Sequence, residues 1–216
     1  MNSYQLLQQY MCTHFPNVGT CKPLFYNMPI GIRFEIGNPD FNVTVENGYM
    51  EQVYHRSIEL FKEIHSNSDE LFLIVNAHRH FGLPSISKSK RVNVFKKYIK
   101  DKNLLYKLNA VELPYIYDKE EMEFRTYQYV LRCKVADIRY SSLLRAIGNQ
   151  DMGVRPKVFD ECFFINTTRH TIFNLYDDRG LDIASNCKGT LKELYIKYND
   201  WILDYDREQI DEIFST

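Results

Sequence analysis

A helical stripe that runs directly into a buried strand is the feature that most restricts the fold of this chain. From Asn47-Gly48 onwards, apolar side chains recur every three or four positions, at Met50, Val53, Tyr54, Ile58, Phe61 and Ile64. This spacing predicts one buried face of a helix. The apolar run Leu71–Val75 follows and is typical of a strand covered on both faces. The strict alternation of Ile32–Ile36 predicts an earlier strand, so strand, helix and strand indicate a βαβ unit.

The rest of the chain continues to alternate between helical and extended patterns. Helices are predicted in 88–102, 141–147 and 191–202, and strands in 124–135, 162–165, 171–176 and 181–184, the last three as an antiparallel meander. We therefore expect a mixed α/β (α+β) fold with a mixed parallel and antiparallel sheet flanked by helices. Without repeats or linkers, residues 1–216 are expected to form a single domain, with a turn-rich N-terminal region over residues 1–45, a βαβ-like region over residues 46–136 and a meander plus C-terminal helix in 137–216.

Composition excludes several classes of protein. Forty-four per cent of the 216 residues are hydrophobic, which predicts a packed core, and 27 basic against 28 acidic residues leave no positive field for nucleic acid. Five widely spaced cysteines without a Cys-x-x-Cys pair indicate reduced thiols. No basic leader starts the sequence, and its longest wholly apolar run is far shorter than the roughly 20 residues of a membrane helix. We expect a cytoplasmic protein without a membrane partner.

Three carboxylates crowd the predicted junction of two strands. Asp177, Asp178 and Asp182 surround Arg179 and Gly180. The structural interpretation is a hairpin turn, in which Gly supplies a positive φ, Asp caps nearby amides and Arg neutralises one carboxylate. The functional interpretation is a recognition surface for a basic partner, because dense carboxylates bind arginine-rich proteins.

The same carboxylates leave a metal-dependent hydrolase or nuclease open as an alternative. Hard divalent cations prefer oxygen ligands, but such a site needs an acid from another element, and Glu35 and Glu161 are available. No complete catalytic motif is present, so no cofactor is expected and the metal question stays open.

The C-terminal string contains the single tryptophan among acids: Asp200, Trp201, Asp204 and Asp206. At helical spacing Trp201 shares a face with Leu194, which predicts core packing. The alternative is an interface anchor, because Trp and Tyr beside carboxylates are typical of binding hot spots.

His78 and His80 follow the apolar strand, where ligands collect at the carboxyl ends of parallel strands. They would share a strand face and could act in acid–base chemistry or in a small-ligand sensor, but the sequence places no acid beside them. Two histidines in a surface loop are the structural interpretation.

A local basic patch lies in the predicted helix 88–102. Its members are Lys88, Lys90, Arg91, Lys96, Lys97, Lys100 and Lys102. Phe95 and Tyr98 interleave with them, which would permit base stacking, although the same two residues fit the buried stripe of a solvated helix.

Two C-terminal strings resemble a known family. Residues 172–182, IFNLYDDRGLD, and 194–206, LYIKYNDWILDYD, resemble the bacterial domain-of-unknown-function family 3885, as do Phe25–Asn27, Ile32–Glu35, Asn149–Asp151 and Phe163–Asn166. The resemblance implies no reaction, cofactor or partner. Some small bacterial families of this kind act as immunity proteins beside toxins, and by that analogy the chain would bind a toxin-like protein.

These observations together favour a non-enzymatic protein-binding module of the immunity or antitoxin kind. Its expected binding residues are Asp177, Asp178, Arg179, Asp182, Asp200, Trp201, Asp204 and Asp206, facing a basic partner surface. The metal-dependent hydrolase and the small-ligand sensor remain the alternatives.

Overall fold

One seven-stranded sheet forms the centre of the protein. The computed structural model describes residues 1–37, 48–80 and 93–215. In space the strands follow the order β1-β7-β6-β5-β2-β4-β3, and every neighbouring pair is antiparallel. Their bounds are β1 Gly31–Glu35, β2 Glu70–His80, β3 Asn109–Pro114, β4 Phe124–Lys134, β5 Glu161–Asn166, β6 Thr171–Leu175 and β7 Gly180–Ser185.

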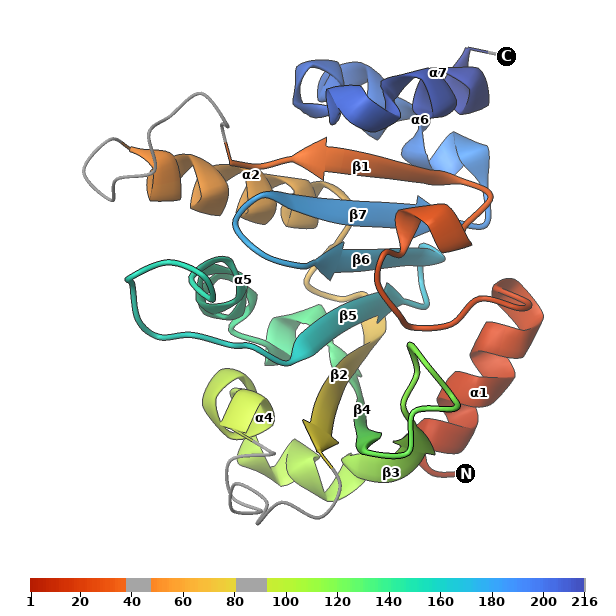
Figure 1. Cartoon of the computed structure of the whole chain (residues 1–216), viewed down its shortest axis with the longest axis vertical. Coiled ribbons are helices and arrows are strands. Elements are labelled where there is room, and N and C mark those ends of the chain that lie inside the picture. The colour runs from red at the N-terminus through yellow and green to blue at the C-terminus, as the bar shows by residue number, and fades with distance from the viewer. Residues whose placement is uncertain (38–47, 81–92, 216) are drawn as a thin grey trace.

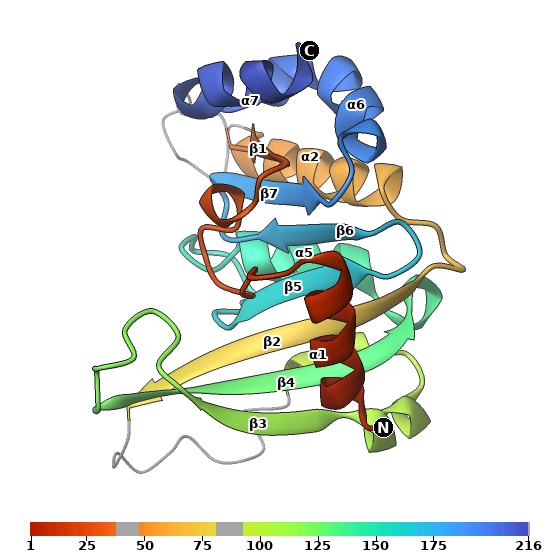
Figure 2. The ribbon, with the colours of Figure 1, turned by 90° about the vertical axis from the view of Figure 1, so that its right-hand side faces the viewer.

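Helices cover both faces of this sheet. They are α1 Ser3–His14, α2 Tyr49–Glu63, α4 Asn93–Tyr98, α5 Tyr140–Gly148, α6 Lys188–Lys197 and α7 Arg207–Phe214, with short 3-10 helices η1 Phe25–Asn27, η3 Lys102–Lys107, η4 Val135–Asp137, η5 Asn199–Trp201 and η6 Asp204–Asp206. Helix α1 lies on one face and α2 and α5 lie on the other (Figures 1 and 2). Among the described helices, none is both long enough and apolar enough to cross a membrane.

The mixed α+β class is confirmed, but the expected parallel portion of the sheet and the βαβ unit are wrong. Strands β1 and β2, which flank α2, are not neighbours, because β7, β6 and β5 lie between them. These three strands form the expected meander, and its short turns can join only antiparallel neighbours. The meander therefore occupies the place beside β1 where a βαβ crossover would have put β2 as a parallel neighbour.

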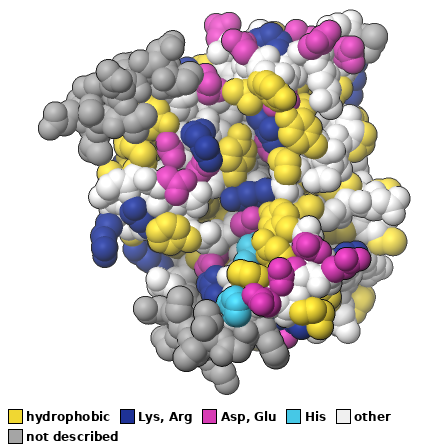
Figure 3. All heavy atoms as spheres, viewed as in Figure 1, with side chains coloured by type: hydrophobic (Ala, Val, Ile, Leu, Met, Phe, Trp, Pro, Cys, Tyr) yellow, Lys and Arg dark blue, Asp and Glu magenta, His cyan; other side chains and the backbone are white. Residues whose placement is uncertain are grey.

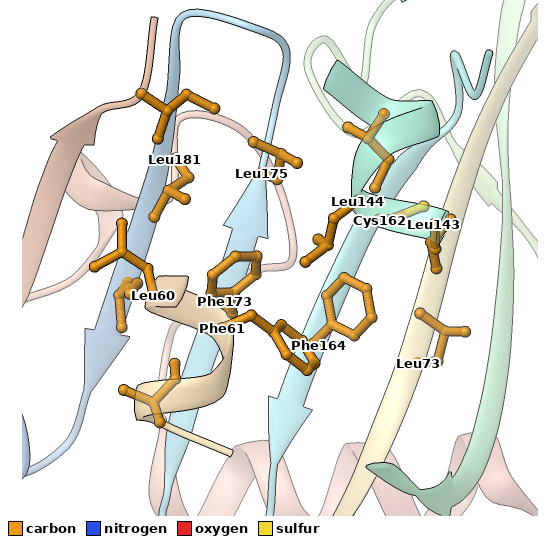
Figure 4. Close-up of a cluster of buried hydrophobic side chains, with 14 of the residues drawn as sticks. Leu60, Phe61, Leu73, Leu143, Leu144, Cys162, Phe164, Phe173, Leu175 and Leu181 are labelled. Carbon is orange, nitrogen blue, oxygen red and sulfur yellow. The ribbon is translucent and has the colours of Figure 1, made fainter. Parts of the chain in front are cut away.

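Strand β2 is buried on both faces, as its apolar run predicts. Leu71, Leu73 and Val75 point into the larger core beneath α2 and α5, whereas Phe72 and Ile74 point into the smaller core beneath α1. Alternate residues of a strand face opposite sides of the sheet, so a strand with cores on both sides must be apolar throughout. Figure 4 shows Phe61 of α2 beside Phe164 and Phe173 in the larger core.

The predicted helices differ in how far they extend. Helix α2 matches its predicted stripe, with Met50 and Val53 buried. Residues 88–92 of the predicted basic helix lie outside the described residues, and α4 forms the following part, residues 93–98. The predicted C-terminal helix ends at Lys197, and Trp201 lies in the separate turn η5.

Candidate functional site

The acidic turn joins β6 to β7 and is stabilised by its own side chains. Asp177 is buried, its Oδ1 accepts the backbone N–H of Arg179 at 2.8 Å, and its Oδ2 accepts Nε of the same arginine at 3.0 Å. Gly180 does not supply the expected positive φ. It is required for close approach, because a Cβ there would lie 2.1 Å from the Tyr176 hydroxyl and 3.0 Å from the Phe34 carbonyl oxygen.

Asp178 has a different partner from Asp177 and connects the turn to helix α2. The hydroxyl of Tyr49 donates a 2.7 Å hydrogen bond to Asp178 Oδ2, and both side chains are buried. Burial and this contact raise the pKa of Tyr49, so the phenol stays protonated and remains a donor.

Replacing Tyr49 with Phe removes that donor and leaves a buried carboxylate with one hydrogen bond fewer. We expect the free energy of unfolding to fall by about 2 kcal/mol, the usual range for a hydrogen bond to a charged group. Urea denaturation measures the change, and Tyr106→Phe, at a side chain that is 80% exposed, is the control that should be nearly neutral. Equal effects of the two variants would contradict this role of Tyr49.

Arg33 and Asp182 form an ion pair that the strand register creates. They face each other across β1 and β7, on the side of the sheet that carries α1. Arg33 Nε donates to Asp182 Oδ1 at 2.8 Å and Nη2 donates to Oδ2 at 3.2 Å. The backbone N–H of Phe25 donates to the same carboxylate at 3.0 Å, so Asp182, which has no exposed surface, is fully engaged.

Asp206 completes this network from the C-terminal segment. Its carboxylate accepts Arg33 Nη1 at 3.3 Å and the Tyr26 hydroxyl at 2.7 Å, and the Tyr26 ring lies 4.6 Å from the guanidinium carbon. Burial alone would lower the pKa of Arg33, but its hydrogen bonds to Asp182 and the negative charges of Asp182 and Asp206 outweigh burial, and the pKa is raised. We call Arg33, Asp182, Asp206 and Tyr26 the arginine network.

The eight residues expected to bind a partner divide into a buried and an exposed group. Asp177, Asp178, Asp182 and Asp206 are each less than 10% exposed. The reason is that each of them is bound by a donor: Arg179 of the same turn binds Asp177, Tyr49 of α2 binds Asp178, and Arg33 of β1 binds Asp182 and Asp206. The side chain of Arg179 is 76% exposed.

Apart from Arg179, the residues outside the buried group lie near the C-terminus: Asp200 and Asp204 are exposed and Trp201 is partly exposed. Residues 199–215 hold six acidic residues and one basic one. Trp201 is half-buried and packs against the core, as the core interpretation predicts. The guanidinium carbon of Arg56 lies 5.1 Å from the centre of its ring. Carboxylates gather along the upper rim in Figure 3, where α7 lies in Figure 1. The C-terminal acidic surface is defined here as Asp204, Tyr205, Glu208 and Glu212, all exposed.

The carboxylates proposed for a metal site do not converge. Within residues 1–37, 48–80 and 93–215, no three His, Cys, Asp or Glu side chains are grouped as metal ligands would be. Glu161, one of the two distant acids considered, instead accepts the Tyr117 hydroxyl at 2.5 Å. Glu161 therefore belongs to a polar cluster separate from the acidic turn.

His78 and His80 each have an acidic neighbour that the sequence did not indicate. His78 Nε2 lies 3.1 Å from Glu161 Oε2, and its Nδ1 lies 3.0 Å from Thr126 Oγ1. His80 Nε2 lies 3.3 Å from Glu123. The acids come from β5 and from the segment before β4, which are adjacent to β2 only after the sheet has formed. Burial opposes ionisation of Glu161, but His78, Tyr117 and Lys22 lower its pKa.

The basic patch has no aromatic surface within its described residues. Lys96 and Lys97 are exposed on α4, whereas Phe95 and Tyr98 are buried in the core. These rings cannot stack on bases, and the solvated-helix interpretation fits α4. Lys88, Lys90 and Arg91 lie outside the described residues.

A cleft of about 510 Å³ lies beside the arginine network, and we call it the Lys22 cleft. Its walls come from five separate segments: the loop before η1, strand β1, the loop between β3 and β4, the turn after α5 and the acidic turn. The lining residues are Lys22, Pro23, Arg33, Tyr117, Gln150, Asp151, Tyr176, Asp177 and Arg179. The sequence interpretation missed Lys22, Arg33, Tyr117 and Gln150, because none belongs to a charge cluster along the chain.

Comparison with known proteins places the chain among proteins of unknown function. A family model described as a domain of unknown function, DUF3885, matches residues 7–206. The uncharacterized protein YnaE of Bacillus subtilis (strain 168) is 27% identical over 207 residues, which cover 91% of this chain and 96% of that protein. No solved structure matches.

Proposed function

Because the chain belongs to the DUF3885 family, as the resemblance of its C-terminal strings predicted, we propose a function from its own surface. The protein is a non-enzymatic binding module, of the immunity or antitoxin kind, that docks a partner protein with a basic face onto the C-terminal acidic surface. The charge of residues 199–215 supports a basic partner, since opposite potentials guide encounter and suppress unsuitable partners.

The exposure of Tyr205 is the observation that carries this proposal. Its side chain is 86% exposed and follows Asp204, whose carboxylate side chain is 93% exposed. Within α7, which begins two residues after Tyr205, spacing of three and four residues places the exposed side chains of Glu208, Gln209 and Glu212 on one face of the helix. Exposed tyrosines within a charged rim are typical of binding hot spots.

The arginine network supports the proposal by fixing the base of this surface. Arg33 and Tyr26 both bind Asp206, the residue directly after Tyr205. The segment is also held by the backbone N–H of Leu203, which donates to the Arg33 carbonyl at 3.0 Å. A rigid presentation lowers the conformational entropy lost on binding.

Replacing Tyr205 with Ala is expected to weaken binding of the partner at least about tenfold, the usual effect of truncating a hot-spot tyrosine. The partner is identified by affinity capture from cells that make the chain, purified, and titrated in a reconstituted binding assay. Raising the salt from about 50 to 500 mM should weaken binding further, because exposed charges are screened.

Matched variants distinguish specific binding at this surface from non-specific association. Tyr106→Ala, which removes another tyrosine that is 80% exposed, should leave the affinity unchanged. The double change Glu51→Gln and Glu120→Gln removes two exposed carboxylates elsewhere and should also be neutral. Unchanged affinity in Tyr205→Ala, or a captured partner that binds independently of salt, would refute the proposal.

A further inference from the structure

The Lys22 cleft combines a cation and a carboxylate that do not neutralise each other. Lys22 Nζ donates to the backbone carbonyl of Tyr176 at 3.3 Å, and within the described residues it has no carboxylate at ion-pair distance. An ammonium group has three donors, so this contact leaves Lys22 with capacity for an acceptor in the cleft.

The opposite charge belongs to the turn after α5. Asp151 is exposed and lines the cleft together with Arg179 and Asp177. Arg179 is bound directly by Asp177, so of the two carboxylates and one guanidinium on this wall, Asp151 is the charge without an ion pair among the described residues and gives the wall an excess of negative charge.

The two walls approach each other at one atom. Gln150 Nε2 donates to the Tyr176 carbonyl at 2.7 Å, and this is the same oxygen that Lys22 reaches. Gln150 directly precedes Asp151, and both line the same cleft as Lys22. In Figure 1 the loop before η1 and the turn after α5 approach the ends of β5, β6 and β7 from different sides.

The other charges of the cleft are satisfied by the protein. Arg33 in its lining is bound by Asp182 and Asp206. The rings of Tyr117 and Tyr176 add apolar surface to the lining. A mostly satisfied cavity with two convergent, opposite charges and aromatic walls has the character of a small-ligand site.

We propose that the Lys22 cleft binds a zwitterionic small molecule of the α-amino acid class, with its carboxylate on Lys22 and its ammonium group on Asp151. A ligand with only one charge would desolvate the opposite wall without compensating it, which gives the site its selectivity. The site is separate from the C-terminal acidic surface and its occupancy does not depend on a protein partner.

The test uses the full chain and the twenty standard L-amino acids as probes in thermal unfolding, followed by calorimetric titration. L-phenylalanine, 3-phenylpropionate and phenethylamine form a matched set, because the last two each lack one of its charges. We expect at least one amino acid to bind with a Kd below about 10 mM and to raise the Tm. Analogues of that amino acid that lack either its ammonium group or its carboxylate should bind at least about tenfold more weakly than the amino acid itself. Where L-phenylalanine binds, 3-phenylpropionate and phenethylamine provide this comparison.

Charge variants locate the site. Lys22→Gln and Asp151→Asn should each weaken binding at least about tenfold. Lys192→Gln and Glu193→Gln, at exposed positions of α6, should bind as the unchanged chain does, and so should Tyr205→Ala. Failure of all twenty amino acids to bind, equal binding of an analogue with one charge, or unchanged affinity in Lys22→Gln would overturn the proposal. None of these outcomes bears on partner docking, which the Tyr205→Ala titration tests by itself.

Discussion

Replacing Arg33 with Met is expected to lower the free energy of unfolding by about 3–5 kcal/mol, a large fraction of the stability of a typical domain. The change leaves Asp182 and Asp206 buried, at 0% and 4% exposure, without their shared cation. Other donors remain, since Phe25 N–H still reaches Asp182 and Tyr26 still reaches Asp206, but neither carries charge. Urea denaturation at neutral pH measures the loss.

Two further variants separate this effect from that of an ordinary ion pair. Arg132→Met breaks the contact with Glu70, in which both side chains are 45% exposed, and should cost less than about 1 kcal/mol. Arg33→Lys keeps the charge but loses the planar two-bond contact with Asp182, so an intermediate loss is expected even where Arg33→Met fails to fold. A cost for Arg33→Met as small as that for Arg132→Met would show that the network contributes little.

The predictable features of the fold are those set by local periodicity. The stripe of α2 and the apolar run of β2 each depend on residues close together in sequence, and both elements formed where expected. The order of the strands depends instead on which distant segments pair, and local pattern has no information on that choice. This is why the expected parallel pairing of β1 with β2 failed.

The arginine network shows the same limit at the level of the site. Alternation in Ile32–Ile36 predicts the strand and also places Arg33 on the face opposite Ile32 and Phe34. Asp182 occupies the equivalent position between Leu181 and Ile183. The sequence therefore contains two opposite charges on apolar strands, but only the observed register of β1 against β7 makes them partners. Charge density along the chain instead favoured Asp177 and Asp178 as binding residues. In the structure Asp177 binds Arg179 of the same turn, and Asp178 binds Tyr49 of α2.

The network also links the two proposed binding regions. Arg33 lines the Lys22 cleft, and through Asp206 it holds the segment that presents Tyr205. Segments far apart in sequence, including those that carry the family resemblance around Tyr26, Arg33, Gln150 and Tyr176, meet at this place. Variants of Arg33 would therefore disturb both regions, which is why each region is tested with its own exposed residues.

His65 provides the second large effect, a loss of stability in mild acid. The ring is buried, stacks on Phe61 at 3.9 Å between centroids, and has its Nδ1 2.8 Å from the Phe61 carbonyl oxygen. Nδ1 must therefore carry the proton, and Nε2 is buried without a hydrogen-bond partner in the part of the chain that the structure describes. Burial lowers the pKa of His65 from 6.5 to about 4, with opposing contributions from the Phe61 carbonyl and Asp69 and a further lowering from Arg169.

The direction of the pH dependence follows from the proton that His65 takes up when the chain unfolds. Between pH 6.5 and 4 the unfolded chain has His65 protonated while the folded chain keeps it neutral, so acid favours unfolding. The stability present above pH 6.5 is lost as the pH falls, by about 2 kcal/mol between pH 7 and 5 and roughly 3 kcal/mol by pH 4. Urea denaturation across this range measures the slope. His65→Phe keeps a ring on Phe61 but cannot ionise, so its stability should change less between pH 7 and 5, whatever its absolute value. His55→Gln, at an exposed histidine, should retain the slope of the unchanged chain, and an equal slope in His65→Phe would assign the acid sensitivity to other groups.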